Sequence, residues 1–129
     1  MTMRDAFVDL GAITHNVETL RGAVGDVATM VIVKANGYGH GAVPVARAAL
    51  AGGAEWLGVA DLDEALELRA AGIKAPVLAW LHEPGRSFTD AINGGVDIGV
   101  SYVEQLEAAA AASGVAFVQL KVDTGLSRN

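Results

Sequence analysis

Short apolar runs rich in β-branched residues alternate with longer segments rich in alanine, leucine and glutamate along most of this chain. Such runs predict five strands, at residues 29–34, 56–60, 76–80, 96–101 and 116–122. Helices are predicted between them at residues 42–51, 62–71, 87–93 and 102–113, each followed by a glycine. A further strand at 6–10 and a helix at 13–21 precede this repeat. The alternation predicts an α/β fold built around a parallel sheet.

The spacing of the predicted strands narrows the architecture to two forms. Successive strands lie roughly 20 to 27 residues apart, the size of one βα unit in a (β/α)8 barrel of the TIM type. An open doubly wound sheet also contains such units, so the periodicity leaves both forms possible. The sequence stops directly after the fifth predicted strand, and we expect an incomplete fold with two unpaired sheet edges. Another polypeptide is expected to cover those edges.

Composition excludes several classes of protein. The 129 residues suit one domain, and 52% hydrophobic with 19% charged residues indicates a folded chain rather than a disordered one. The net charge of −6 and the absence of a basic cluster argue against nucleic acid or an anionic membrane as a partner. There is no cysteine, no signal-like N-terminus and no apolar run of spanning length. These features predict a cytoplasmic protein whose partners are small molecules or protein.

A lysine ends the first predicted strand and three glycines follow it in the segment VIVKANGYGHG, residues 31–41. Ligands bind at the carboxyl ends of parallel strands, where shielding from water makes a lysine amine a better nucleophile toward a carbonyl. The glycines let the backbone approach an anion closely, and Tyr38 offers a hydroxyl donor. The alternative is a lysine that ends a strand in solvent, followed by a plain glycine turn. The residues alone make Lys34 a candidate Schiff-base former and match neither the P-loop nor the dinucleotide pattern.

The three histidines give no metal site. Histidine is a common general base, but the place of His40 beyond Tyr38 favours a hydrogen bond that braces the glycine turn. His15 is predicted on the exposed face of the first helix, and His82 in the loop after the third strand. No spacing of histidines and carboxylates resembles a metal-binding motif, so we expect no metal.

Three ordered segments resemble the alanine racemases of bacteria. VxKANGYGHG is similar to the cofactor-lysine signature of that family, and KVDTGLSRN at 121–129 is similar to the segment on its fifth barrel strand. The opening VDLGAITHNV at 8–17 resembles the family's start. The Arg-Asn ending is nearest to the racemases of high-GC Gram-positive bacteria. The resemblance covers essentially the whole chain, and it implies the first five βα units of a truncated TIM-type barrel.

The resemblance assigns roles to several residues. It implies that Lys34 holds pyridoxal 5'-phosphate as a Schiff base and carries a proton at the substrate Cα. Tyr38 matches the tyrosine that binds the cofactor phosphate, and Arg128 matches the arginine that reaches the cofactor's phenolic oxygen and the substrate carboxylate. Lys121 matches a lysine that is carbamylated in many relatives, with a plain structural lysine as the alternative.

Two further positions follow from the same resemblance. Trp80 lies where the family places an apolar contact to the cofactor ring, and a core tryptophan is the alternative. Asp123 is expected to orient the backbone of its loop rather than to transfer protons.

The resemblance also implies a function for the whole protein: interconversion of L-alanine and D-alanine, supplying D-alanine for peptidoglycan, by a homodimer. Residues 1–129 would then be the N-terminal part of the barrel domain, without the C-terminal β-domain that supplies the second proton carrier. We therefore expect this chain alone to be inactive. Two alternatives remain: a non-catalytic piece with a structural or interaction role, and another pyridoxal-phosphate barrel protein.

Overall fold

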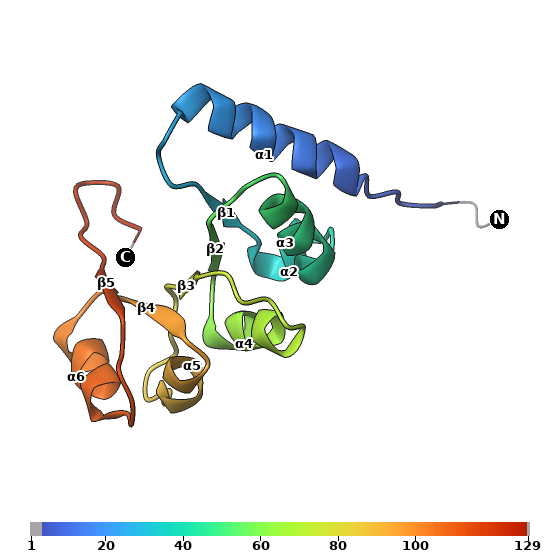
Figure 1. Ribbon diagram of the computed structural model, residues 1–129. Coiled ribbons are helices and arrows are strands. Elements are labelled where there is room, and N and C mark those ends of the chain that lie inside the picture. Colours follow the sequence, from blue (N-terminus) through green and yellow to red (C-terminus); the bar gives the residue numbers. More distant parts are fainter. Residues whose placement is uncertain (1–3, 129) are drawn as a thin grey trace.

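A computed structural model describes residues 4–128 of the chain and shows one sheet of parallel strands (Figure 1). The strands are β1 (Met30–Ile32), β2 (Trp56–Val59), β3 (Val77–Ala79), β4 (Val96–Val100) and β5 (Val118–Leu120). They are ordered β1-β2-β3-β4-β5, and every neighbouring pair is parallel. Each predicted strand of the repeat is therefore confirmed. Within the described part of the chain, β1 and β5 each pair on one side only.

Helices lie along the outer side of the curved sheet, and each of β1 to β4 is followed by at least one of them (Figure 1). They are α1 (Leu10–Val24), α3 (Ala42–Ala51), α4 (Leu62–Ala70), α5 (Thr89–Asn93) and α6 (Val103–Ala111). A doubly wound sheet would reverse its strand order and carry helices on both faces. Sequential order with helices on one side is instead the wall of a (β/α)8 barrel, which confirms the predicted barrel class. Over residues 4–128, no helix combines the length and apolarity needed to cross a membrane.

The predicted strand at residues 6–10 is wrong. Residues 4–9 have no regular secondary structure, and Leu10 already begins α1. The Asp9 side chain accepts a hydrogen bond from the amide of Ala12 at 3.1 Å, so the capped helix begins three residues earlier than the apolar pattern suggested. Phe7 is 90% exposed, and no described strand pairs with this segment to bury it. Helix capping therefore decides the structure here.

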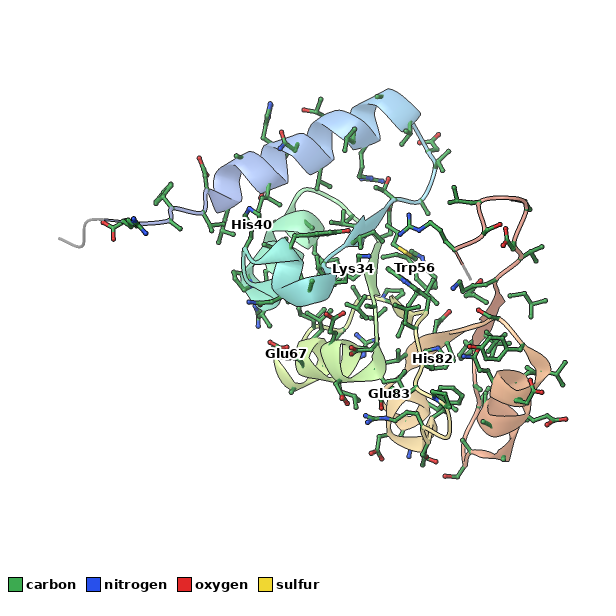
Figure 2. The ribbon with its side chains drawn as sticks, turned by 180° about the vertical axis from the view of Figure 1, so that it is seen from behind. Lys34, His40, Trp56, Glu67, His82 and Glu83 are labelled. Carbon is green, nitrogen blue, oxygen red and sulfur yellow. The ribbon has the colours of Figure 1, made fainter. Side chains whose placement is uncertain are left out.

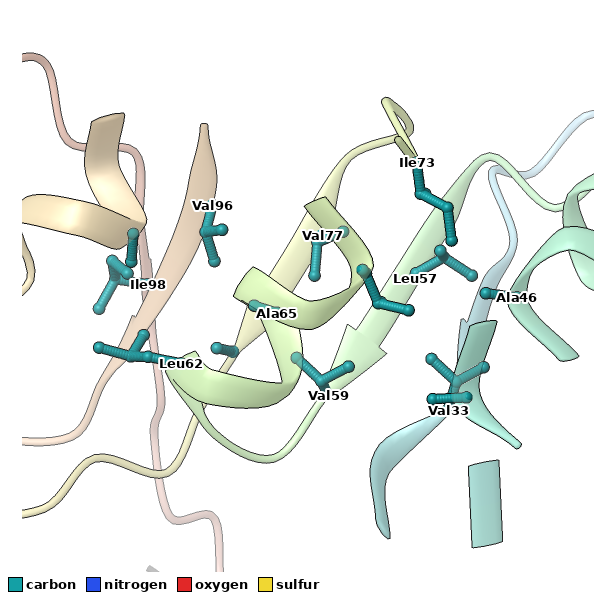
Figure 3. Close-up of a cluster of buried hydrophobic side chains, with 14 of the residues drawn as sticks. Val33, Ala46, Leu57, Val59, Leu62, Ala65, Ile73, Val77, Val96 and Ile98 are labelled. Atoms are coloured by element: carbon teal, nitrogen blue, oxygen red, sulfur yellow. The ribbon is translucent and has the colours of Figure 1, made fainter. Parts of the chain in front are cut away.

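The hydrophobic core lies between the outer face of the sheet and the helices. Alternate strand residues point outward, and Leu57, Val59 and Val77 are fully buried against α4 (Figure 3). Leu62 and Ala65 face them from that helix (Figure 3). Side chains alternate between the two faces of a strand, so the intervening residues point to the inner face of the barrel wall. On this inner face, the side-chain amide of Gln119 in β5 donates a hydrogen bond to the carboxylate of Asp97 in β4 at 3.1 Å.

Candidate functional site

The segment after β1 is a left-handed turn that begins directly after Lys34. Although α2 (Lys34–Tyr38) has helical hydrogen bonding, Ala35 has φ +50° and Asn36 has φ +53°. Gly37 and Tyr38 continue with φ +62° and +54°. A run of positive φ that includes three non-glycine residues is costly, at about 1–3 kcal/mol for each such residue. The surrounding contacts must hold this conformation.

Side chains of the turn supply part of that support. The ring Nδ1 of His40 donates to the carbonyl oxygens of Gly37 at 3.0 Å and Tyr38 at 3.1 Å. Asn36 accepts from the amide of Ala42 at 2.9 Å and so satisfies the first turn of α3. These bonds confirm that His40 braces the glycine turn, as the sequence predicts.

Lys34 and Tyr38 are neighbours on this turn. The Nζ of Lys34 lies 6.0 Å from the centre of the Tyr38 ring, at the outer limit of a cation–π contact. Lys34 is half-buried, whereas Tyr38 is 58% exposed. Figure 2 shows Lys34 and His40 on the same turn. The structure therefore places Lys34 at the carboxyl end of β1, as predicted, with its side chain partly open to solvent.

A cleft of about 340 Å³ opens over the carboxyl ends of β2 to β5. Trp80, Lys121 and Arg128 all line it. Its volume is in the range of pockets that bind small molecules. Charged side chains of both signs surround it, namely Asp61, Asp63, Glu83, Arg86, Lys121 and Arg128. The cleft thus brings together three residues that were predicted from distant parts of the sequence.

Trp80 packs against two glycines of the neighbouring strands, Gly58 in β2 and Gly99 in β4. A Cβ on Gly58 would lie 2.8 Å from Cζ3 of the indole, and one on Gly99 would lie 2.9 Å from the Cβ of Trp80. Both distances are too short for real atoms, so only glycine allows the tryptophan to lie this close to β2 and β4. Trp80 is half-buried and one side of it faces the cleft.

Lys34 and Tyr38 are not among the residues that line this cleft. The register nevertheless relates Lys34 to Trp80, because Ile32 pairs with Gly58 and Gly58 pairs with Leu78. The ends of β1 and β3, which precede Lys34 and Trp80, are therefore two strands apart, a separation of about 10 Å at the usual strand spacing. The predicted residues therefore form two groups at the carboxyl end of the sheet: Lys34 with Tyr38, and Trp80 with Lys121 and Arg128.

Asp123 organises the loop that carries Arg128. Its Oδ1 accepts hydrogen bonds from the amides of Gly125 at 2.8 Å and Ser127 at 3.0 Å. The bond from Gly125 is the main reason that the pKa of this carboxyl lies below its ordinary value, with the Ser127 bond next. This geometry agrees with the prediction that Asp123 orients the loop backbone.

Sequence reasoning missed the contacts made by two residues, His82 and Glu64. His82 lies beside Glu83 in the loop after β3 and lines the cleft (Figure 2). Its Nε2 donates a hydrogen bond to the carbonyl oxygen of Gly99 at 2.8 Å. Glu64 hydrogen-bonds to backbone amides of two different strand ends. The pattern from Asp61 to Glu64 is a capping-box signature, which could have indicated that the Glu64 carboxylate turns back toward the backbone. Nothing in the sequence around His82 indicates its partner on β4.

Comparison with known proteins identifies the family. Residues 8–129 match the model of the alanine racemase N-terminal domain. An alanine racemase of Mycolicibacterium smegmatis is 59% identical over 126 residues, which are 95% of this chain and 32% of that protein. One from Mycobacterium ulcerans is 55% identical over 98% of this chain and 34% of its own length.

Solved structures agree with the sequence comparison. The alanine racemase of Streptomyces lavendulae, which produces D-cycloserine, superposes with a TM-score of 0.90 at 50% identity, over 95% of this chain and 33% of that one. The enzyme of Streptomyces coelicolor superposes with a TM-score of 0.88 at 46% identity. The chain spans about a third of the length of these relatives. Because the family model matches residues 8–129 and these structures superpose over almost the whole chain, the chain belongs to the alanine racemase N-terminal domain family.

Proposed function

We propose that this chain works as part of a pyridoxal-phosphate-dependent racemase that interconverts L-alanine and D-alanine. The observation that carries the proposal is the position of Lys34, a half-buried amine at the end of β1, in a chain that matches the family model over residues 8–129. An amine in this setting is suited to bond with the aldehyde of the cofactor. When bound, that cofactor withdraws electrons from the substrate and so makes the Cα proton removable.

The residues present suit such a cofactor. A ring and a phosphate need an apolar wall, an amine for attachment and donors for oxygen atoms. Trp80, which packs closely against Gly58 and Gly99, offers the apolar wall, and Lys34 offers the amine. Arg128 and Tyr38 offer donors. The cleft beside Trp80 is large enough for a small molecule.

Each of these residues has a proposed task. Lys34 holds the cofactor and moves a proton to or from the substrate Cα, while Tyr38 binds the cofactor phosphate. Trp80 packs against the cofactor ring. Arg128 binds the cofactor's phenolic oxygen and the substrate carboxylate through its planar fork of donors. Lys121 lines the same cleft as Arg128 and, if carbamylated, would present an anion to that arginine.

The wider assignment rests on the relatives. Proteins named alanine racemase match this chain over about a third of their length, so residues 1–129 are proposed to be the N-terminal part of the barrel domain. The second proton carrier and a C-terminal β-domain are then supplied outside these residues, and the chain alone is inactive. We further propose a cytoplasmic homodimer that supplies D-alanine for peptidoglycan.

Borohydride trapping tests the cofactor site. The chain is incubated with pyridoxal phosphate, reduced and digested, and the pyridoxyl adduct is located by peptide mass analysis. The chain has three lysines, so Lys74, which is exposed, reports non-specific reaction within the same sample. We expect the adduct to concentrate at Lys34 and to vanish from that peptide in K34A. An adduct spread evenly over Lys34, Lys74 and Lys121, or absent at saturating cofactor, would support the inert structural piece instead.

A further inference from the structure

Glu64 connects two strand ends through its carboxylate. Its Oε1 accepts a hydrogen bond from the amide of Ala35 at 2.6 Å, and its Oε2 accepts one from the amide of Ala60 at 2.8 Å. Ala60 follows β2, and Ala35 follows Lys34 at the end of β1. One side chain of α4 therefore holds the backbone immediately after the lysine.

This arrangement differs from an ordinary capping box. In that motif the third residue of the helix turns back to the amide of the N-cap residue. Here the N-cap is Asp61, whose side chain accepts from the amide of Glu64 at 2.9 Å as expected. The Glu64 carboxylate, however, passes the N-cap amide and binds Ala60 with one oxygen. The other oxygen is thereby free to reach the neighbouring strand.

The residue that Glu64 holds is the first of the left-handed run. Ala35 has φ +50°, a conformation that residues with a Cβ rarely adopt. Its carbonyl accepts from the amide of Gly39 within the turn, whereas its amide is held from outside by Glu64. The direction of the Ala35 amide fixes the peptide plane between Lys34 and Ala35. Glu64 thus restrains the peptide group attached to the Cα of Lys34, and with it the direction in which the lysine side chain leaves the backbone.

We propose that Glu64 is a positioning residue for Lys34, and that it does this by hydrogen-bonding the peptide that follows the lysine. The inference rests on the proposed attachment of pyridoxal phosphate to Lys34. Glu64 touches neither the cofactor nor the substrate in this role. Its two bonds tie the turn after β1 to the end of β2, so the amine approaches the cofactor aldehyde from one direction.

Two substitutions separate hydrogen-bonding reach from charge. E64Q keeps the length of the side chain, but the NH2 group that replaces one carboxylate oxygen cannot accept, so one of the two backbone bonds is lost. E64D keeps the charge and is one methylene shorter, so it cannot span both amides. If Glu64 acts only through its charge near Lys34, E64D behaves like the unchanged protein. E67Q is the matched control, since Glu67 is exposed on the same helix one turn further on (Figure 2).

The test compares trapped adduct and amide exchange in the same variants. In E64Q and E64D we expect the ratio of adduct at Lys34 to adduct at Lys74 to fall about fivefold to tenfold, which lies within the range for the net contribution of one ordinary hydrogen bond. Hydrogen exchange at the Ala35 amide is expected to speed up in both variants. E67Q should change neither measurement.

The outcomes distinguish failure of the proposed cofactor site at Lys34 from failure of the positioning role of Glu64. No preference for Lys34 in the unchanged chain removes the proposed cofactor site and this inference with it. A clear preference that persists in E64Q and E64D overturns the positioning role alone, and so does a loss in E64Q that E64D restores. Global unfolding of both variants also overturns it, because Glu64 would then support the whole barrel wall rather than the orientation of Lys34.

Discussion

The ring of His82 is fixed to the neighbouring strand by a hydrogen bond of 2.8 Å from its Nε2 to the carbonyl oxygen of Gly99. Because a carbonyl only accepts, Nε2 carries the proton and Nδ1 carries the lone pair. That Nδ1 is buried and has no hydrogen-bond partner among residues 4–128. Phe88 packs against the ring edge to face, with ring centres 4.9 Å apart. Neutral imidazole therefore suits this position and imidazolium does not.

This setting predicts a pH dependence of stability. Burial is the main cause that lowers the pKa of His82 below its ordinary value of 6.5, and it outweighs the opposing bond to Gly99. The unfolded chain then binds the proton more readily than the folded one. The free energy of unfolding should be greatest above pH 6.5 and should decline as the pH falls from there through the lower folded-state pKa. Urea unfolding at several pH values measures this.

Replacing His82 tests whether this histidine, rather than another titrating group, causes the decline in the free energy of unfolding. H82Q should remove the decline between pH 6.5 and the folded-state pKa, while H15Q, at an exposed position of α1, should leave it as in the unchanged protein. A decline that survives in H82Q would show that another group is responsible.

We expect replacement of Arg69 to lower the free energy of unfolding substantially. Its guanidinium donates to four carbonyl oxygens, those of Gly94 at 2.7 Å, Ala75 at 2.8 Å, and Ile73 and Gly95 at 2.9 Å. These bonds join the two loops that lead into β3 and β4, and a lysine cannot reproduce the fork. R69K should lower the free energy of unfolding by about 2–3 kcal/mol, the range for loss of hydrogen bonds to a charged group.

Arg47 provides the comparison for that measurement. It is exposed and donates to one carbonyl, that of Ala71 at 2.6 Å. R47K should therefore change the free energy of unfolding by less than about 0.5 kcal/mol. Equal effects of R69K and R47K in chemical denaturation would contradict the structural role of Arg69.

Because Trp80 packs closely against Gly99, we expect glycine-to-alanine changes at Gly99 and at Gly22 to have opposite effects on the free energy of unfolding. In G99A the new Cβ would lie 3.0 Å from the backbone Cα of Trp80, which cannot move without shifting β3. We expect a loss of about 1–3 kcal/mol, as for overpacking, and a change in Trp80 fluorescence measured in a W56F background. G22A is the control, because nothing lies within 4 Å of its new Cβ within α1, and it should stabilise by about 0.5–1 kcal/mol.

We expect protonation of Glu55 to lower the free energy of unfolding at acid pH. Its Oε2 accepts from the amide of Thr29 at 2.8 Å, the main cause that lowers the pKa of this carboxyl from 4.5, and Arg21 adds to it. Since the folded state holds the carboxylate more tightly than the unfolded state, this contribution is complete above pH 4.5 and disappears as the pH falls through the folded-state pKa. E55Q should flatten the acid branch of the unfolding curve, and E18Q, exposed on α1, should not. An identical acid branch in E55Q and the unchanged protein would refute the assignment.

Much of the fold follows from local patterns. The five strands and the helices after them were predictable because apolar periodicity and glycine caps act within a few residues. The same patterns failed at residues 6–10, where the Asp9 cap, itself a local signal, outweighs an apolar run that has no described strand beside it. Periodicity also left the barrel and the doubly wound sheet unresolved, because strand order depends on pairing between distant segments.

The sequence by itself determined the βα repeat, the place of Lys34 at the end of the first strand and the similarity to the alanine racemases. Only the tertiary structure decided how that lysine is held. The bond from the Ala35 amide to Glu64 and the contact of Trp80 with Gly58 and Gly99 join residues that are far apart in sequence. Such bonds depend on the register of neighbouring strands, which no local pattern of side chains encodes.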